Sequence, residues 1–264
     1  MKRIYAAALA VLFGLTAVPV LAADDPPPIR QFDQKTLVLF GRYIYREDQF
    51  AWKASDILTA KLSGEQAKAE RLNGLWITHL SRTANVVRFL RDGDNGPEAA
   101  YDVTFEGDGA GVLSVPVNRT LAPEELVQFR ARKLALSSIP RPCSQRYNSV
   151  ALEDLDGNWL VWTLAATTTP GEMMYGGHYR FTIAKDGSSI VQRDALSRSC
   201  MRIPPPDPRQ GQAVGAFVTQ LVSNIPVETT VWLSLLHKTT LYVGTGEKET
   251  WAVSEGTMSR VDNK

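Results

Sequence analysis

The residues best suited to chemistry in this sequence lie on one polar stripe after a double glycine. Following Gly176-Gly177, His178 and Arg180 alternate with apolar residues, which is the period-two pattern of a strand with one buried face. The apolar residues of that pattern are Tyr179, Phe181 and Ile183. A strand places charged groups rigidly, and imidazole titrates near neutral pH. The stripe is therefore interpreted either as a solvated sheet face or as a binding surface.

Neighbouring segments extend this stripe into a candidate binding face. Its members are Tyr175, His178, Arg180, Arg198 and His237. The first hypothesis is a non-enzymatic factor of the inhibitor, immunity or envelope-assembly type, whose partner is another envelope protein. The second is a hydrolase that uses His178 as base, alone or with Glu172. The third is a small-ligand-binding protein, which requires an apolar cavity between sheet and helices.

Known catalytic motifs are missing from the sequence, which favours a protein without enzymatic activity. It contains no G-x-S-x-G nucleophile elbow, no S-x-x-K, no H-E-x-x-H and no P-loop. The three histidines are His79, His178 and His237, and no two of them have the spacing of ligands on one helix. Three histidines that converge in space could hold zinc. We nevertheless expect no metal and no cofactor.

The first residues have the pattern of a secretory signal peptide. Lys2 and Arg3 precede an apolar run from Ile4 to Val20, and small residues end at Ala22. We predict a signal peptide over residues 1–22 and a soluble protein in the periplasm or outside the cell. No later apolar run approaches eighteen residues, so no membrane span is expected.

The cysteine count and the charge balance restrict the partners and the fold. Cys143 and Cys200 are the two cysteines, and in an oxidising compartment such a pair predicts a disulfide. The formal net charge is +1 over 264 residues, so the composition predicts no nucleic-acid partner.

The first half of the mature chain combines strand and helix patterns. We expect a flexible, proline-rich lead over 23–35 and a single globular domain over 36–264, with an internal boundary near 204–208 as an alternative. The apolar run from Thr36 to Tyr45 predicts a strand, and the stripe from Glu47 to Leu62 predicts a helix. Alternating segments between Leu75 and Val117 predict hairpins, and Pro123 to Ser138 predicts a helix.

The second half is dominated by strand patterns. Trp159 to Ala166 is apolar on both faces and predicts a central strand, and Asp186-Gly187 predicts a hairpin turn after the polar stripe. Gly215 to Ser223 predicts a short helix. A closing meander is expected from three runs: Thr229 to Leu236, Leu241 to Val243, and Trp251 to Val253. The expected class is α+β, an antiparallel sheet of hairpins and meanders with a few helices packed on one face.

Overall fold

The computed structural model describes residues 28–81, 83–107, 109–206, 209, 215–246 and 248–261. The predicted signal peptide and the first part of the predicted lead lie outside these residues, as do positions 207 and 208 of the suggested boundary. The described chain has an α+β fold with mostly antiparallel sheets, as the sequence predicted. None of its described helices is long and apolar enough to cross a membrane.

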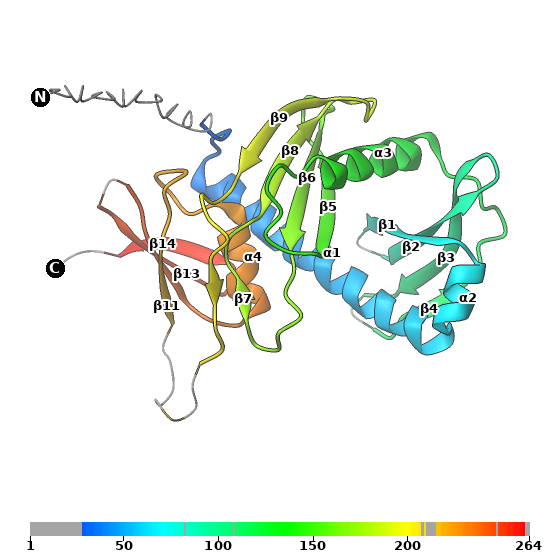
Figure 1. Cartoon of the computed structure of the whole chain (residues 1–264), viewed down its shortest axis with the longest axis horizontal. Coiled ribbons are helices and arrows are strands. Elements are labelled where there is room, and N and C mark those ends of the chain that lie inside the picture. The colour runs from blue at the N-terminus through cyan, green and yellow to red at the C-terminus, as the bar shows by residue number, and fades with distance from the viewer. Residues whose placement is uncertain are drawn as a thin grey trace, which may run out of the picture.

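A long helix, α1 (Gln34–Lys61), connects the parts of the molecule (Figure 1). Asp33 caps its first turn, because the Asp33 Oδ1 accepts from the Thr36 backbone N–H at 3.0 Å. Its buried positions Leu37, Gly41 and Ile44 recur at helical spacing. The predicted strand over Thr36 to Tyr45 is therefore wrong, because this apolar run covers a helix face rather than a sheet.

The first sheet has the order β1-β2-β3-β4 and packs against the C-terminal half of α1. Its strands are β1 (Leu72–Leu80), β2 (Asn85–Gly93), β3 (Gly96–Phe105) and β4 (Val112–Ser114). The short helix α2 (Gly64–Ala69) lies between α1 and β1. Phe50, Ala54 and Leu58 of α1 pack on Val87 and Val103 of the sheet, which confirms the predicted helical stripe.

The central sheet has the order β5-β6-β8-β9 and is covered on both faces. Its strands are β5 (Tyr147–Glu153), β6 (Trp159–Ala165), β8 (Tyr179–Ile183) and β9 (Ile190–Ala195). Helix α3 (Pro123–Ser137) packs Ala131 and Ala135 on one face, against Val161 and Phe181. The opposite face packs on α1 and α4 (Glu228–Leu236). Every residue of β6 and of β8 is buried as a result.

A C-terminal sheet completes the fold, in the order β11-β12-β13-β14. Its strands are β11 (Ala216–Thr219), β12 (Leu241–Gly244), β13 (Thr250–Ser254) and β14 (Thr257–Val261), and a separate pair joins β7 (Met173–Met174) to β10 (Arg202–Ile203). The predicted helix over Gly215 to Ser223 is wrong, since β11 pairs in parallel with β12. The predicted strand over Thr229 to Leu236 is also wrong, since that run forms α4.

Helix α4 can approach α1 closely because a glycine faces it. A Cβ added at Gly41 would lie 2.4 Å from the Cβ of Val231 and 2.7 Å from the carbonyl oxygen of Glu228. The run from Glu228 to Ser234 is buried throughout although four of its seven residues are polar, so its sequence shows no amphipathic period to separate helix from strand. Packing against α1 decides that it is helical.

The predicted disulfide is present between Cys143 and Cys200, whose Cα atoms are 5.3 Å apart. It joins the segment before β5 to the segment after β9. Gly177 lies directly against it at φ +86°, where a Cβ would be 2.4 Å from the Cβ of Cys143. Gly177 thus permits the chain to pass the disulfide in a left-handed conformation.

Candidate functional site

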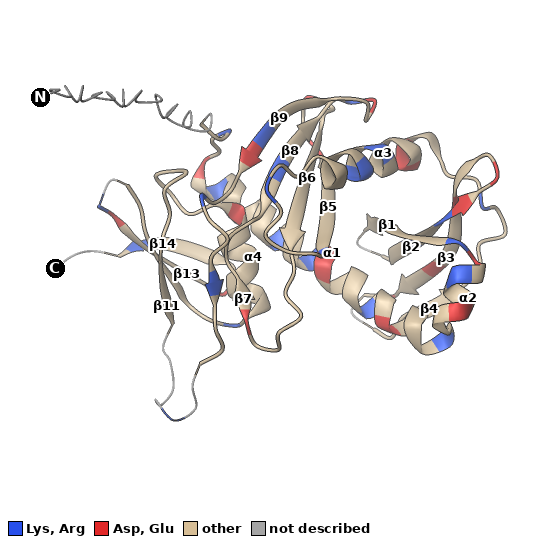
Figure 2. Cartoon of the chain, viewed as in Figure 1, with Lys and Arg blue, Asp and Glu red and all other residues tan. Residues whose placement is uncertain are grey.

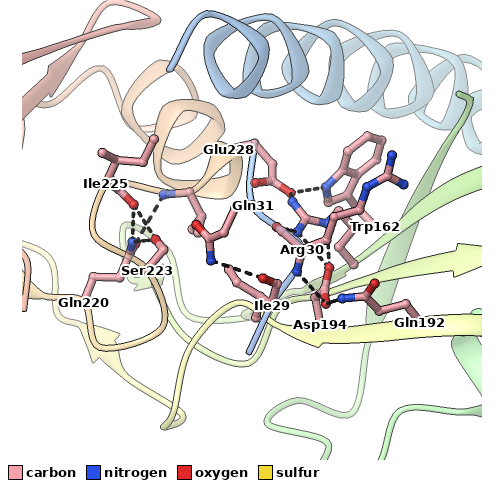
Figure 3. Close-up of polar contacts among 12 residues, drawn as sticks. Ile29, Arg30, Gln31, Trp162, Gln192, Asp194, Gln220, Ser223, Ile225 and Glu228 are labelled. Atoms are coloured by element: carbon pink, nitrogen blue, oxygen red, sulfur yellow. Dashed lines mark hydrogen bonds and ion pairs between the residues drawn. The ribbon is translucent and has the colours of Figure 1, made fainter. Parts of the chain in front are cut away.

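The polar stripe of β8 lies inside the protein, where Arg180 joins two carboxylates. Arg180 Nε and Nη2 donate to Asp194 Oδ2 at 3.0 and 2.7 Å, and Nη1 donates to Glu228 Oε1 at 2.8 Å. Trp162 Nε1 donates to the same Glu228 oxygen at 2.7 Å, and Figure 3 shows the indole directed at that carboxylate. This triad links β8, β9 and α4. It is part of the core, and the expected accessible surface around Arg180 is wrong.

The end of the predicted lead covers the outer side of this triad. The Arg30 backbone N–H donates to Asp194 Oδ1 at 3.1 Å, and the Arg30 carbonyl accepts from Arg180 Nη2. The Phe32 ring lies 4.6 Å from the Arg180 guanidinium carbon, and Ile29 is buried. Ile29, Arg30 and Phe32 therefore pack against the fold, whereas residues 28, 31 and 33 of the predicted lead are exposed.

His178 is a structural histidine in this fold. Its Nδ1 accepts from the Ala165 backbone N–H at 3.0 Å, so its Nε2 carries the proton and donates to the Met174 carbonyl at 2.8 Å. Burial lowers the pKa of His178 to about 4, which keeps the ring neutral. Both nitrogens are occupied and the side chain is buried, so this geometry offers no support for the predicted role of His178 as a hydrolytic base.

The other members of the predicted binding face lie in different parts of the structure. Tyr175 is buried, with its hydroxyl 3.3 Å from Thr230 Oγ1. It lines, together with Arg198, a small pocket of about 50 Å³. His237 lies elsewhere, at the C-terminal end of α4, where it lines a larger cleft. The five residues do not form one surface, because the covered strand carries part of them into the interior.

The larger cleft has a volume of about 180 Å³, and residues of α1, β5, β6, β7 and α4 line it. We call it the Asp48–Trp232 cleft. Its polar lining includes Asp48, Glu172 and His237, and its apolar lining includes Leu164, Met174 and Trp232. His178 supports the cleft from behind, because its ring packs edge-on against Trp232 with centroids 5.3 Å apart and an interplanar angle of 84°.

Asp48 is the distinctive group of the cleft. Its Oδ2 accepts from Trp232 Nε1 and its Oδ1 from Asn148 Nδ2, both at 3.4 Å, which is long for a hydrogen bond. Within the described chain, no basic side chain forms an ion pair with it. Burial raises the pKa of Asp48. This carboxylate is therefore weakly satisfied at the edge of an apolar space.

Glu172 and His237 differ from Asp48 in their environments. Glu172 Oε1 accepts from Thr167 Oγ1 at 2.7 Å and lies 3.6 Å from Arg202 Nη1, so its charge has a partner. The backbone N–H of His237 ends α4 by donating to the Leu233 carbonyl at 2.9 Å. Burial lowers the pKa of His237, which keeps its imidazole neutral at pH 7.

Two other polar clusters join helices to sheets. Arg132 of α3 lies 3.7 Å from Glu47 of α1, and both are fully buried. On the first sheet, His79 Nε2 lies 2.8 Å from Glu125 Oε1, and Arg88 Nη1 donates to the same oxygen at 2.7 Å. Neither cluster lines the Asp48–Trp232 cleft. His79, on the first sheet, is therefore not part of a three-histidine zinc site, and the described residues hold no group of His, Cys, Asp or Glu suited to a metal.

Comparison of the chain with protein-family models, with curated proteins and with solved structures finds no match. Function must therefore be argued from the site alone. Sequence reasoning included His237 and Glu172 but missed Asp48 and Trp232. Asp48 lies within the helix that the apolar stripe predicted. Nothing in the local pattern pointed to its role, because the cleft forms only once α4 packs beside α1.

Proposed function

We propose that the mature chain is an exported, non-enzymatic binding protein that holds a small ligand in the Asp48–Trp232 cleft. The observation that carries this proposal is a carboxylate without an ionic partner in the described chain, beside an apolar floor that contains Trp232. Small-molecule sites combine mostly apolar linings with a few polar groups that orient the ligand. The cleft has this composition and lies between sheet and helices.

Export to the periplasm or beyond is part of the proposal. It is supported by the basic start and apolar run of residues 1–22 and by the disulfide between Cys143 and Cys200. Figure 2 shows acidic and basic residues interspersed over the elements. This distribution, with a formal net charge of +1, offers no electrostatic attraction for nucleic acid.

A small ligand is preferred here to the protein partner that the sequence first suggested. The protein-binding hypothesis depended on a shared surface of Tyr175, His178 and Arg180, and all three are buried. The small-ligand hypothesis required an apolar cavity between sheet and helices, and the Asp48–Trp232 cleft fits that requirement.

A second candidate function is acid–base catalysis in the same cleft. Burial raises the pKa of Asp48 and lowers the pKa of His237, so the carboxyl moves toward a proton donor and the imidazole toward a proton acceptor. Both groups line the same cleft, where a carboxyl and an imidazole could exchange a proton with a bound ligand. NMR of a bound ligand over time separates the two functions, since a binding protein returns the ligand unchanged and an enzyme converts it.

The proposed function is tested by ligand-observed NMR with a panel of small neutral, cationic and anionic molecules. Ala166 lines the cleft, and Ala166→Phe should fill part of it. Ala60→Phe on the exposed side of α1 is the matched control. We expect ligands that bind the wild type and the control but not the cleft-filled variant. If no molecule loses binding in Ala166→Phe, the cleft is not a binding site.

A further inference from the structure

The charged residues that line the Asp48–Trp232 cleft are all acidic. Two carboxylates, Asp48 and Glu172, are among its lining residues, and no Lys or Arg is. Arg202 approaches Glu172 at 3.6 Å and offsets that charge, whereas Asp48 has no ionic partner in the described chain. The only other titratable group of the lining, His237, is kept neutral by burial. Among the described residues, none therefore places a positive charge beside Asp48.

Asp48 retains unused hydrogen-bonding capacity. A carboxylate can accept about four hydrogen bonds, and Asp48 receives two long ones, from Trp232 and Asn148 at 3.4 Å. A partly buried charge that is poorly hydrogen-bonded is unfavourable unless a partner of opposite charge compensates it. An ammonium group supplies that charge together with several N–H donors, and such charge-assisted bonds are short and strong.

The apolar lining limits the size and nature of the rest of the ligand. Leu164, Met174 and Leu233 lie in the same cleft as the Trp232 ring. Its volume of about 180 Å³ is slightly larger than a cavity of about 150 Å³ that accepts benzene in another protein. One six-membered ring or an equally short aliphatic chain fits this space, and a larger body extends into solvent.

We propose that the Asp48–Trp232 cleft binds a small organic cation, with an ammonium group on the Asp48 carboxylate and an apolar body of about one ring against Trp232 and Leu233. This inference rests on the proposed binding function and names its ligand class. It predicts discrimination by charge among molecules of the same shape. An anion of that shape should be rejected, since it would face Asp48 and Glu172.

The test uses three molecules that share one ring: benzylamine, benzyl alcohol and benzoate. Binding to the mature chain is measured by isothermal titration calorimetry at pH 7. A hydrogen bond to a charged group contributes more than a neutral one, so benzylamine should bind about tenfold or more tightly than benzyl alcohol. Benzoate should show no binding. This comparison needs no variant and does not depend on how a mutation affects folding.

Two variants then assign the preference to one carboxylate. Asp48→Asn keeps the shape of the side chain and removes the charge, so it should bring benzylamine to the affinity of benzyl alcohol. Asp56→Asn is the matched control, because Asp56 is an exposed acid on the same helix outside the cleft. It should leave both affinities unchanged. Circular dichroism confirms that each variant is folded.

The possible results separate the two proposals. Equal binding of benzylamine and benzyl alcohol to the wild type, both lost in Ala166→Phe, overturns the cation inference and leaves the binding function standing. Preference for the amine that persists in Asp48→Asn also overturns it. If neither compound binds at millimolar concentration, and no molecule of the wider panel depends on Ala166, the binding function fails as well.

Discussion

His178 makes the folded protein sensitive to acid by a predictable amount. The pKa of its buried imidazole is about 4, against an ordinary value of 6.5. The unfolded chain takes up a proton as the pH falls below 6.5, and the folded chain does not until about pH 4. Stability from this residue is therefore complete above pH 6.5 and is lost as the pH falls toward 4. Between pH 8 and pH 5 the loss is about 2 kcal/mol in the free energy of unfolding.

The assay compares urea unfolding of the wild type and His178→Asn at several pH values from 8 to 5. The Asn side-chain oxygen can still accept from the Ala165 N–H, but the side chain does not titrate. The variant should be less stable at pH 8, and its stability should fall by about 2 kcal/mol less than that of the wild type by pH 5. Parallel pH profiles would refute the reasoning.

A second measurement does not depend on the variant. The ring proton resonances of His178 in the wild type should show no titration between pH 7 and pH 5, because the ring stays neutral in the folded state. A midpoint near pH 6.5 would mean that the ring is solvated. The hydrogen bonds to Ala165 and Met174 would then not hold in solution.

Three further changes test the core by chemical or thermal unfolding. Arg180→Met leaves two carboxylates buried without their cation and should reduce the free energy of unfolding by about 3–5 kcal/mol; a loss below 1 kcal/mol would contradict the buried triad. Gly41→Ala should lower the melting temperature, although alanine favours a helix by about 1 kcal/mol, since its Cβ would meet Val231; a rise would show that α1 and α4 are farther apart. Replacing Cys143 and Cys200 by serine should lower stability by up to about 4 kcal/mol in urea for a loop of this length; an unchanged midpoint would mean that the bond does not constrain the chain.

Sequence patterns predicted an element correctly where the residues that define it are close neighbours in the sequence. The helix α3 begins at Pro123 with Glu124 and Glu125 in its first turn and ends before Pro140, as the sequence predicted. The turn at Asp186-Gly187 is also where the sequence placed it, with Gly187 at φ +73°. These features depend on proline geometry, the helix dipole and glycine conformations, which act within a few residues. The disulfide followed from the presence of two cysteines in a chain predicted to be exported to an oxidising compartment.

Patterns failed where an apolar run had no period. Thr36 to Tyr45 and Thr229 to Leu236 both resembled strands, but they lie in the first turns of α1 and in α4. The buried faces of the two segments pack on each other, and Gly41 lets them meet. A short run without a clear helical or strand period can form either structure, so the tertiary contact decided which one forms.

The sequence by itself determined the α+β class, the hairpins, the α3 helix and the disulfide, because these depend on neighbouring residues or on composition. Only the tertiary structure decided which polar groups are available to a ligand. The alternation around Arg180 predicted its face of the strand, but α4 and residues 28–33 cover that face, with Glu228 and Asp194 as partners. Asp48 faces the cleft because α4 brings Trp232 beside it. Whether a residue is exposed depends on which segments pack on it, and those segments lie far away in the sequence.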